Sequence, residues 1–183
     1  MDLTDELRRV AEAAARFAEP GEEVAGIVPA EPAAGNRAYV CAFRRDEETT
    51  WLVLDADARP IEDRAAVREA VAIAVLCELA DEVAGGGDLD DLRSRLVALR
   101  MTENPQGIDE AEEAAAALQT TIGAAPRVAT PAHLDAVGSA TLRLEQVLGG
   151  PGESPFAAAM KRAAATVEEL ATDVETHYKR QLR

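Results

Sequence analysis

One uninterrupted apolar segment constrains the fold of this chain more than any other feature. Residues 70–77 are eight consecutive apolar residues, and they lie within a predicted helix, residues 64–84, that Asp63 can cap at its start. A helix that is apolar around its whole circumference is buried on every side. The pattern therefore predicts a central core helix, packed against a sheet on one face and against later helices on the other.

The segment before this helix has the alternation that is typical of β-strands. Three stretches alternate or run apolar, at residues 24–28, 38–43 and 51–54. In the second stretch every other residue from Tyr39 to Phe43 falls on one face, and the polar residues 44–49 that follow are few enough for a hairpin loop. After a turn at residues 55–59, Ile61 is expected to start a short fourth strand. The pattern predicts an antiparallel meander of three to four strands.

Amphipathic helices are expected on both sides of the meander. Apolar residues recur at three- and four-residue steps from Leu3 to Phe17, which predicts a first helix that ends at Glu19-Pro20-Gly21. Further helix starts are expected at Asp88, at Asp109 after a turn through residues 101–107, at Thr130-Pro131 and at Ser154-Pro155. The fold class is therefore α+β: an N-terminal helix, a three- to four-stranded antiparallel meander and a mainly helical C-terminal half.

Two regions are expected along the chain, with a boundary at Asn104-Pro105, because proline disfavours helix in the residue before it. Residues 1–100 form an α+β domain around the central helix, and residues 101–183 form a helical region that packs on it. Over about the first 85 residues the order of helix, meander and helix is similar in topology to small acidic secretion-chaperone-like proteins, with no motif in common.

The last predicted helix carries an apolar stripe longer than a small domain is wide. At about 1.5 Å per residue, some 26 residues would span roughly 39 Å, and the alanine-rich helices before it offer little bulk to cover the stripe. We expect part of it to meet a second copy of the chain, with packing inside the chain as the rival interpretation. The candidate interface residues are Phe156, Met160, Val167, Leu170 and Val174.

The net charge excludes two classes of partner. The chain has 19 Lys+Arg against 34 Asp+Glu, which gives a formal charge of -15. Proteins that bind nucleic acids or anionic membranes do so through clustered Lys and Arg side chains. We therefore predict no nucleic-acid partner and no membrane partner. No run of 18 uncharged apolar residues occurs, so no membrane span is expected, and the acidic first residues argue against a signal peptide. Cys41 and Cys77 lie in apolar runs without CxxC spacing, which favours reduced, buried thiols and a cytoplasmic location.

No residue pattern singles out a catalytic centre, a cofactor or a metal site, so enzymatic activity stays an open question. His133 and His177 have no catalytic motif around them. Residues 55–57 begin like a calcium loop, yet Pro60 stands where that loop needs glycine. We predict no catalytic residue, no cofactor and no metal.

One group of side chains has the character of a recognition site. An indole and guanidinium groups together can hold an anionic or aromatic ligand, and Trp51 lies across the predicted hairpin from Arg44 and Arg45. The alternative is that Trp51 is a core residue. The favoured function is a non-enzymatic cytosolic interaction or adaptor protein, homodimeric, whose partner is itself or another protein. The competing class is a small-molecule binder or hydrolase with a pocket between the sheet and the helices.

Overall fold

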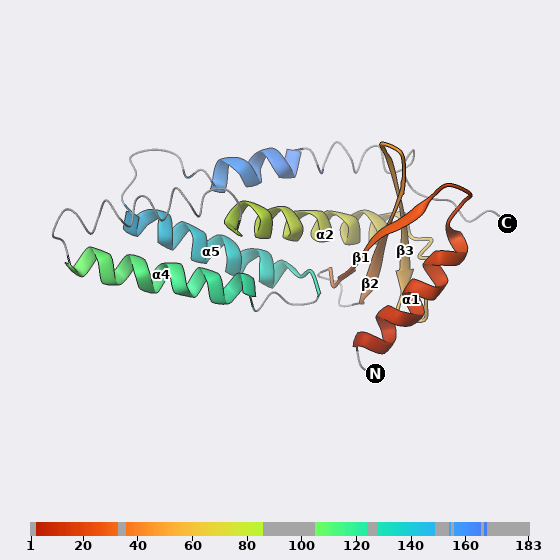
Figure 1. The fold of residues 1–183 in the computed structure, drawn as a ribbon, viewed down its shortest axis with the longest axis horizontal. Helices are drawn as coiled ribbons and strands as arrows, with labels where there is room; N and C mark the ends of the chain where they lie inside the picture. The colour runs from red at the N-terminus through yellow and green to blue at the C-terminus, as the bar shows by residue number, and fades with distance from the viewer. Residues whose placement is uncertain are drawn as a thin grey trace. The chain divides into compact units, whose positions relative to one another are not determined.

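Figure 1 shows the computed structural model of the chain, which describes residues 3–32, 36–85, 105–123, 128–148, 154, 156–165 and 167. The chain divides into two compact units. An α/β unit comprises Met1–Val75, Arg127–Pro131 and Thr166–Arg183, and a helical unit comprises Leu76–Pro126 and Ala132–Ala165. The division after Val75 falls inside one helix, α2 (Arg64–Gly85). The boundary expected at Asn104-Pro105 stays a prediction, because residues 86–104 before Pro105 lie outside the described residues.

The α/β unit is built on a three-stranded antiparallel sheet in the order β1-β2-β3. Its elements are α1 (Leu3–Phe17), β1 (Glu23–Ala30), β2 (Ala38–Arg45), β3 (Glu48–Asp55) and the first half of α2. The α+β class, the N-terminal helix and the antiparallel meander are confirmed.

The expected fourth strand is wrong. Among the described residues, Pro60 forms only an isolated bridge with Leu54, and Ile61 donates one backbone hydrogen bond to Val53 at 2.9 Å. Proline lacks the N–H group that a continued ladder needs, so the chain leaves the edge of β3 after this contact and enters α2.

The β2–β3 hairpin closes with a two-residue turn. Arg45 pairs with Glu48, and Asp46 between them has a φ of 53°, a left-handed conformation in which aspartate is enriched. The polar stretch at residues 44–49, expected as a loop, is therefore mostly strand, and only two of its residues make the turn.

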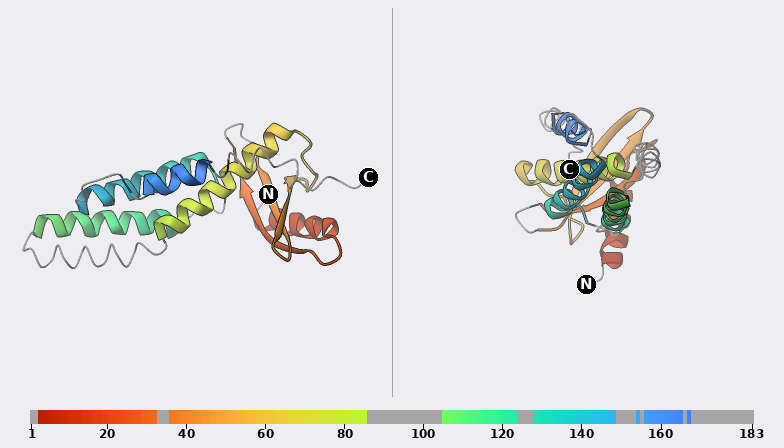
Figure 2. Two further views of the ribbon diagram at one scale, coloured as in Figure 1. Left: turned by 90° about the horizontal axis from the view of Figure 1, so that it is seen from above. Right: turned by 90° about the vertical axis from the view of Figure 1, so that its left-hand side faces the viewer.

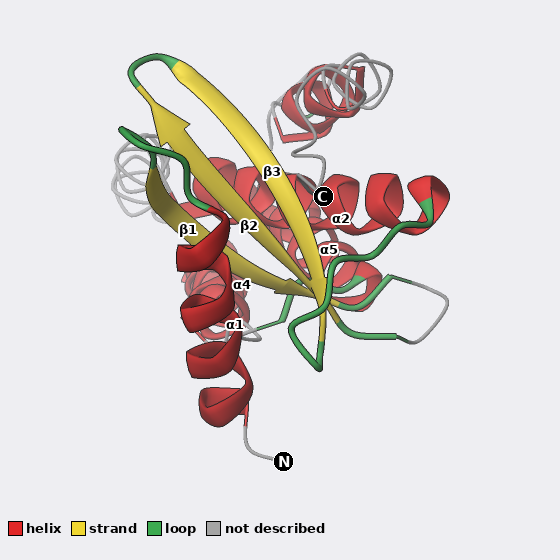
Figure 3. Cartoon of the chain, turned by 90° about the vertical axis from the view of Figure 1, so that its right-hand side faces the viewer, coloured by secondary structure: helices red, strands yellow, loops and turns green. Residues whose placement is uncertain are grey.

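Strand alternation places one apolar face of the sheet under α1. The buried side chains of this core are Val10, Ala14, Tyr39, Cys41, Phe43, Leu52 and Leu54. The alternate residues Val40 and Val53 are buried on the opposite face, and Figure 3 shows the first half of α2 on that side of the sheet. Each face of the sheet is therefore covered by a helix. Cys41 and Cys77 are buried thiols outside any disulfide bond, as predicted.

The helix α2 has the features expected of the central helix. Asp63 caps it, because its Oδ1 accepts a hydrogen bond from the N–H group of Ala65 at 2.9 Å. No residue from 70 to 77 is exposed, and Ile73 in the middle is 8% exposed. Five of the eight residues are buried, and Ala72, Val75 and Leu76 are partly buried. The stretch is therefore largely covered, and its role as the central core helix of one domain stays a prediction.

The helical unit contains the rest of α2, α4 (Pro105–Gly123), α5 (Pro131–Leu148) and the helical residues 156–165. Figure 2 shows these helices running alongside one another. Their shared core is rich in alanine and consists of Ala80, Ala84, Ala111, Ala114, Leu118, Val137, Leu144, Leu148 and Phe156. Because alanine side chains are short, the helix axes can approach closely.

Two of the predicted helix starts are confirmed. The helix α5 begins at Pro131, directly after the expected hydroxyl cap. The hydroxyl of Ser154 accepts a hydrogen bond from the N–H group of Ala157 at 2.9 Å, which is the geometry of a helix cap.

The predicted start at Asp109 is wrong. The helix α4 begins at Pro105, because proline is favoured in the first turn of a helix, where its missing N–H group costs nothing. The helix expected from Asp88 and the last helix beyond residue 167 lie outside the described residues. None of the described helices combines the length and the hydropathy that crossing a bilayer requires.

Candidate functional site

The helix α1 buries a carboxylate in its contact with the sheet. Glu6, Val10 and Ala14 are spaced by four residues and therefore lie on one face of the helix, and all three are buried. Glu6 is 8% exposed. A carboxylate at such a position destabilises the fold unless hydrogen-bond partners replace the lost water.

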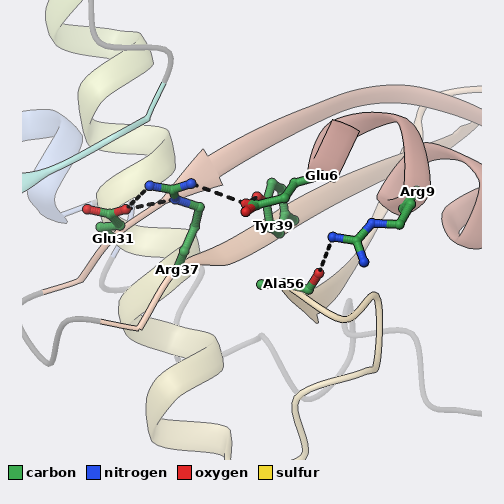
Figure 4. Close-up of polar contacts among 6 residues, drawn as sticks. All are labelled: Glu6, Arg9, Glu31, Arg37, Tyr39 and Ala56. Carbon is green, nitrogen blue, oxygen red and sulfur yellow. Dashed lines mark hydrogen bonds and ion pairs between the residues drawn. The ribbon is translucent and has the colours of Figure 1, made fainter. Parts of the chain in front are cut away.

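Two side chains supply those partners, as Figure 4 shows. Tyr39 of β2 donates its hydroxyl hydrogen to Oε2 of Glu6, and Nη1 of Arg37 lies 3.1 Å from the same oxygen. Arg37 also reaches Glu31, whose Oε1 lies 2.7 Å from its Nε and 2.6 Å from its Nη2. The Glu6 cluster, defined as Glu6, Glu31, Arg37 and Tyr39, therefore joins α1 to β2 and to the end of β1.

This cluster sets the protonation states of Glu6 and Tyr39. The hydrogen bond from Tyr39, with help from Arg37, holds the pKa of Glu6 below its usual range despite burial. Burial, together with the carboxylate of Glu6, raises the pKa of Tyr39 to about 12. Near neutral pH Glu6 is therefore ionised and Tyr39 protonated. Neither pKa lies near neutrality, where a general acid or base works best.

These contacts hold α1 against the sheet. A further contact comes from the same helix, because Nη2 of Arg9 donates a hydrogen bond to the carbonyl of Ala56 at 3.4 Å. Hydrogen bonds to ionised groups are stronger and more directional than neutral ones, so they set the position of α1 on the sheet more narrowly than apolar contacts do. The Glu6 cluster was not predicted from the sequence. The one local feature that pointed to it is the position of Glu6 on the apolar face of α1.

The recognition group predicted from the sequence is split between two faces of the sheet. The register of β2 and β3 places Arg44 and Trp51 in adjacent rows of one face. Arg45 lies on the opposite face, where its Nη2 is 2.9 Å from Glu19 and 3.8 Å from Glu22. The structure therefore brings Arg44 and Trp51 together and directs Arg45 toward the connection between α1 and β1.

The start of the predicted last-helix interface packs inside the chain. Phe156 is 6% exposed within the helical core, and Met160 packs partly buried against that core. Val167 is 7% exposed. Leu170 and Val174 lie outside the described residues, so their part in an interface stays a prediction.

The helix α5 buries a histidine in its first turn. The side chain of His133 is 5% exposed, and its Nε2 lies 2.8 Å from Oδ1 of Asp81 on α2. An ionised carboxylate can only accept, so the ring nitrogen donates. The pair joins two helices of the same unit, as the Glu6 cluster joins a helix to a sheet. Among the described residues, no three His, Cys, Asp or Glu side chains converge as metal ligands would.

Comparisons with protein-family models, with curated proteins and with solved structures find no match for this chain. The topological similarity to secretion-chaperone-like proteins therefore carries no argument about function.

Proposed function

We propose that this chain is a non-enzymatic interaction protein of the cytoplasm that works as a homodimer. The observation that carries the proposal is the outward face of α5. In a chain of net charge -15, the exposed residues of α5 include two charged side chains, Asp135 and Arg143, which have opposite signs. Leu142 lies on the same face and is 38% exposed. Among the described residues, it is the large apolar side chain that is exposed to solvent. A face of low net charge that exposes a large apolar side chain is suited to a protein contact.

The buried polar groups support binding over catalysis. The Glu6 cluster and the pair of His133 with Asp81 hold elements of the fold together. The pKa of Glu6 is lowered and that of Tyr39 is raised to about 12, whereas catalysis near neutral pH favours shifts in the other direction. The buried, reduced thiols support a reducing compartment, and the net negative charge argues against nucleic acid as the partner.

The mass of the protein in solution tests the homodimer. Light scattering coupled to gel filtration at micromolar concentration should give twice the mass of one chain. The mass of a single chain throughout the micromolar range would contradict the proposal.

A small-molecule site is the second candidate, and the adjacency of Arg44 and Trp51 favours it. A guanidinium beside an indole can hold an aromatic anion. Trp51 is the single tryptophan of the chain, so its fluorescence reports binding directly. Titration with 4-nitrobenzoate should quench this emission saturably in the wild type and in Arg45→Ala, and should lose saturation in Arg44→Ala. Equal, unsaturable quenching of all three proteins would exclude the site.

A further inference from the structure

From Ala132 onward, the exposed positions of α5 form a face that is symmetric about its centre. They recur at three- and four-residue steps, which is the spacing of one helix face. The residues of this α5 face are Ala132, Asp135, Ala136, Ser139, Leu142, Arg143 and Gln146. Ser139 is the midpoint, because Ala136 and Leu142 lie three residues before and after it, and Asp135 and Arg143 lie four residues before and after it.

The two charges of the α5 face have no partner among the residues that the structure describes. Neither Asp135 nor Arg143 takes part in a hydrogen bond or an ion pair with any described residue. They are eight residues apart on one helix, about 12 Å along its axis, which is too far for them to pair with each other. Both side chains are exposed, so each can reach a charge of opposite sign on another molecule.

We propose that the α5 face is the contact between two copies of this chain, packed antiparallel about a twofold axis at Ser139. This inference rests on the proposed homodimer and names its surface. In an antiparallel pair centred on Ser139, Asp135 of one copy faces Arg143 of the other, and the same contact occurs twice. Leu142 of each copy meets Ala136 of the other, so a large side chain faces a small one.

A second copy fits this face better than an unrelated protein does. An isologous contact requires one surface to be complementary to itself, and the α5 face meets this requirement in both charge and size. Two chains of net charge -15 repel each other, so a self-contact is most favourable where the local charges balance. The α5 face is such a place, because Asp135 and Arg143 cancel.

Charge reversal tests the register of the contact. Asp135→Arg and Arg143→Asp should each raise the dimer dissociation constant by roughly 10- to 30-fold, because two attractions become two repulsions. The double variant Asp135→Arg/Arg143→Asp restores both pairs and should bring the constant back to within about threefold of the wild type. Glu113→Arg and Arg16→Asp are matched controls, since both residues are exposed outside the α5 face and the charge changes are the same.

Cross-linking tests the position of the axis. Ser139→Cys should form a disulfide-linked dimer under mild oxidation, while Gln119→Cys, an exposed position on α4, should not. The native thiols do not compete, because Cys41 and Cys77 are buried.

The possible outcomes separate the surface from the homodimer. A wild type that stays monomeric at micromolar concentration would overturn both. A dimeric wild type whose dissociation constant is unchanged by either single reversal, or whose double variant stays as weak as the singles, would overturn the α5 contact alone. In that case a loss of the dimer in Leu170→Glu would assign the interface to the last helix instead.

Discussion

Replacing Tyr39 with phenylalanine isolates the hydrogen bond at the centre of the Glu6 cluster. The ring of Tyr39 is fully buried in the core under α1, and Tyr39→Phe keeps that ring in place. The change removes one O–H group, which is the donor to the buried carboxylate of Glu6. Any loss of stability therefore measures the polar contact rather than the packing.

The magnitude follows from the surroundings of the carboxylate. A hydrogen bond to a charged group contributes about 1.5–3 kcal/mol to stability, and a buried group left unsatisfied loses its full desolvation cost. Glu6 is 8% exposed, so water can replace the lost donor only in part. In the variant, Nη1 of Arg37 remains 3.1 Å from Oε2 of Glu6, so the carboxylate keeps one hydrogen-bond partner. We therefore expect Tyr39→Phe to lower the free energy of unfolding of the α/β unit by about 2 kcal/mol.

Urea unfolding followed by the fluorescence of Trp51 measures this loss, because Trp51 lies on β3 of the same unit. The pH dependence has a definite sign. The pKa of Glu6 is lowered from 4.5 in the folded protein, so its contribution is fully present above the unfolded pKa and is lost as the pH falls through the folded pKa. The difference between wild type and Tyr39→Phe should therefore be largest at pH 7 and should shrink below about pH 4.

A double-mutant cycle provides the control. Glu6→Leu removes the carboxylate that accepts the hydrogen bond from Tyr39. In that background Tyr39→Phe should lower the free energy of unfolding much less than it does in the wild type, because no hydrogen bond to Glu6 is left to remove. Equal costs in both backgrounds, or a cost that is the same at pH 3 and pH 7, would refute the assignment of Tyr39 as the partner that keeps Glu6 ionised.

Three further predictions follow from the core. Ile73→Asp should lower the free energy of unfolding by several kcal/mol, enough to prevent folding, since a carboxylate would be buried without a partner. A soluble variant with an unchanged melting curve would show that α2 has an exposed face at this position. Gly138→Ala should raise stability by up to about 1 kcal/mol in thermal unfolding, because its Cβ would lie 3.6 Å from the ring of Phe156, an ordinary contact; destabilisation would show that the helices cannot accept a methyl group. Cys41 and Cys77 should react with a thiol reagent only after denaturant is added, because both are buried and burial raises the pKa of Cys41 to about 12; rapid native labelling of either would contradict this.

The parts of the fold that the sequence predicts well are set by local chemistry. Asp63 and Ser154 cap helices because their side chains reach N–H groups two or three residues ahead, and that distance can be read from the sequence. The predicted start at Asp109 failed because two local rules competed at Pro105. Proline disfavours helix before it and favours helix after it, and the second rule decided where α4 begins.

The Glu6 cluster could not be predicted in the same way. Glu6 meets residues more than thirty positions away, Arg37 and Tyr39, and no spacing rule links an early helix to a later strand at that separation. The division of Arg44 from Arg45 is different. Successive residues of a strand point to opposite faces, so the alternation of β2 already implied that only one of these two arginines could lie beside Trp51.

In the proposed dimer, charge acts on two length scales with opposite effects. The repulsion between two chains of net charge -15 is long-ranged, and salt at about 0.1 M screens it beyond roughly 10 Å. The contacts between Asp135 and Arg143 across the axis would be short and partly desolvated, so the same salt would weaken them less. Moderate salt should therefore strengthen the association, whereas a contact held only by exposed ion pairs would weaken. In this dimer Leu142 of each copy lies next to the axis at Ser139, and its contact with Ala136 of the other copy would keep the two copies together once the long-range repulsion is screened.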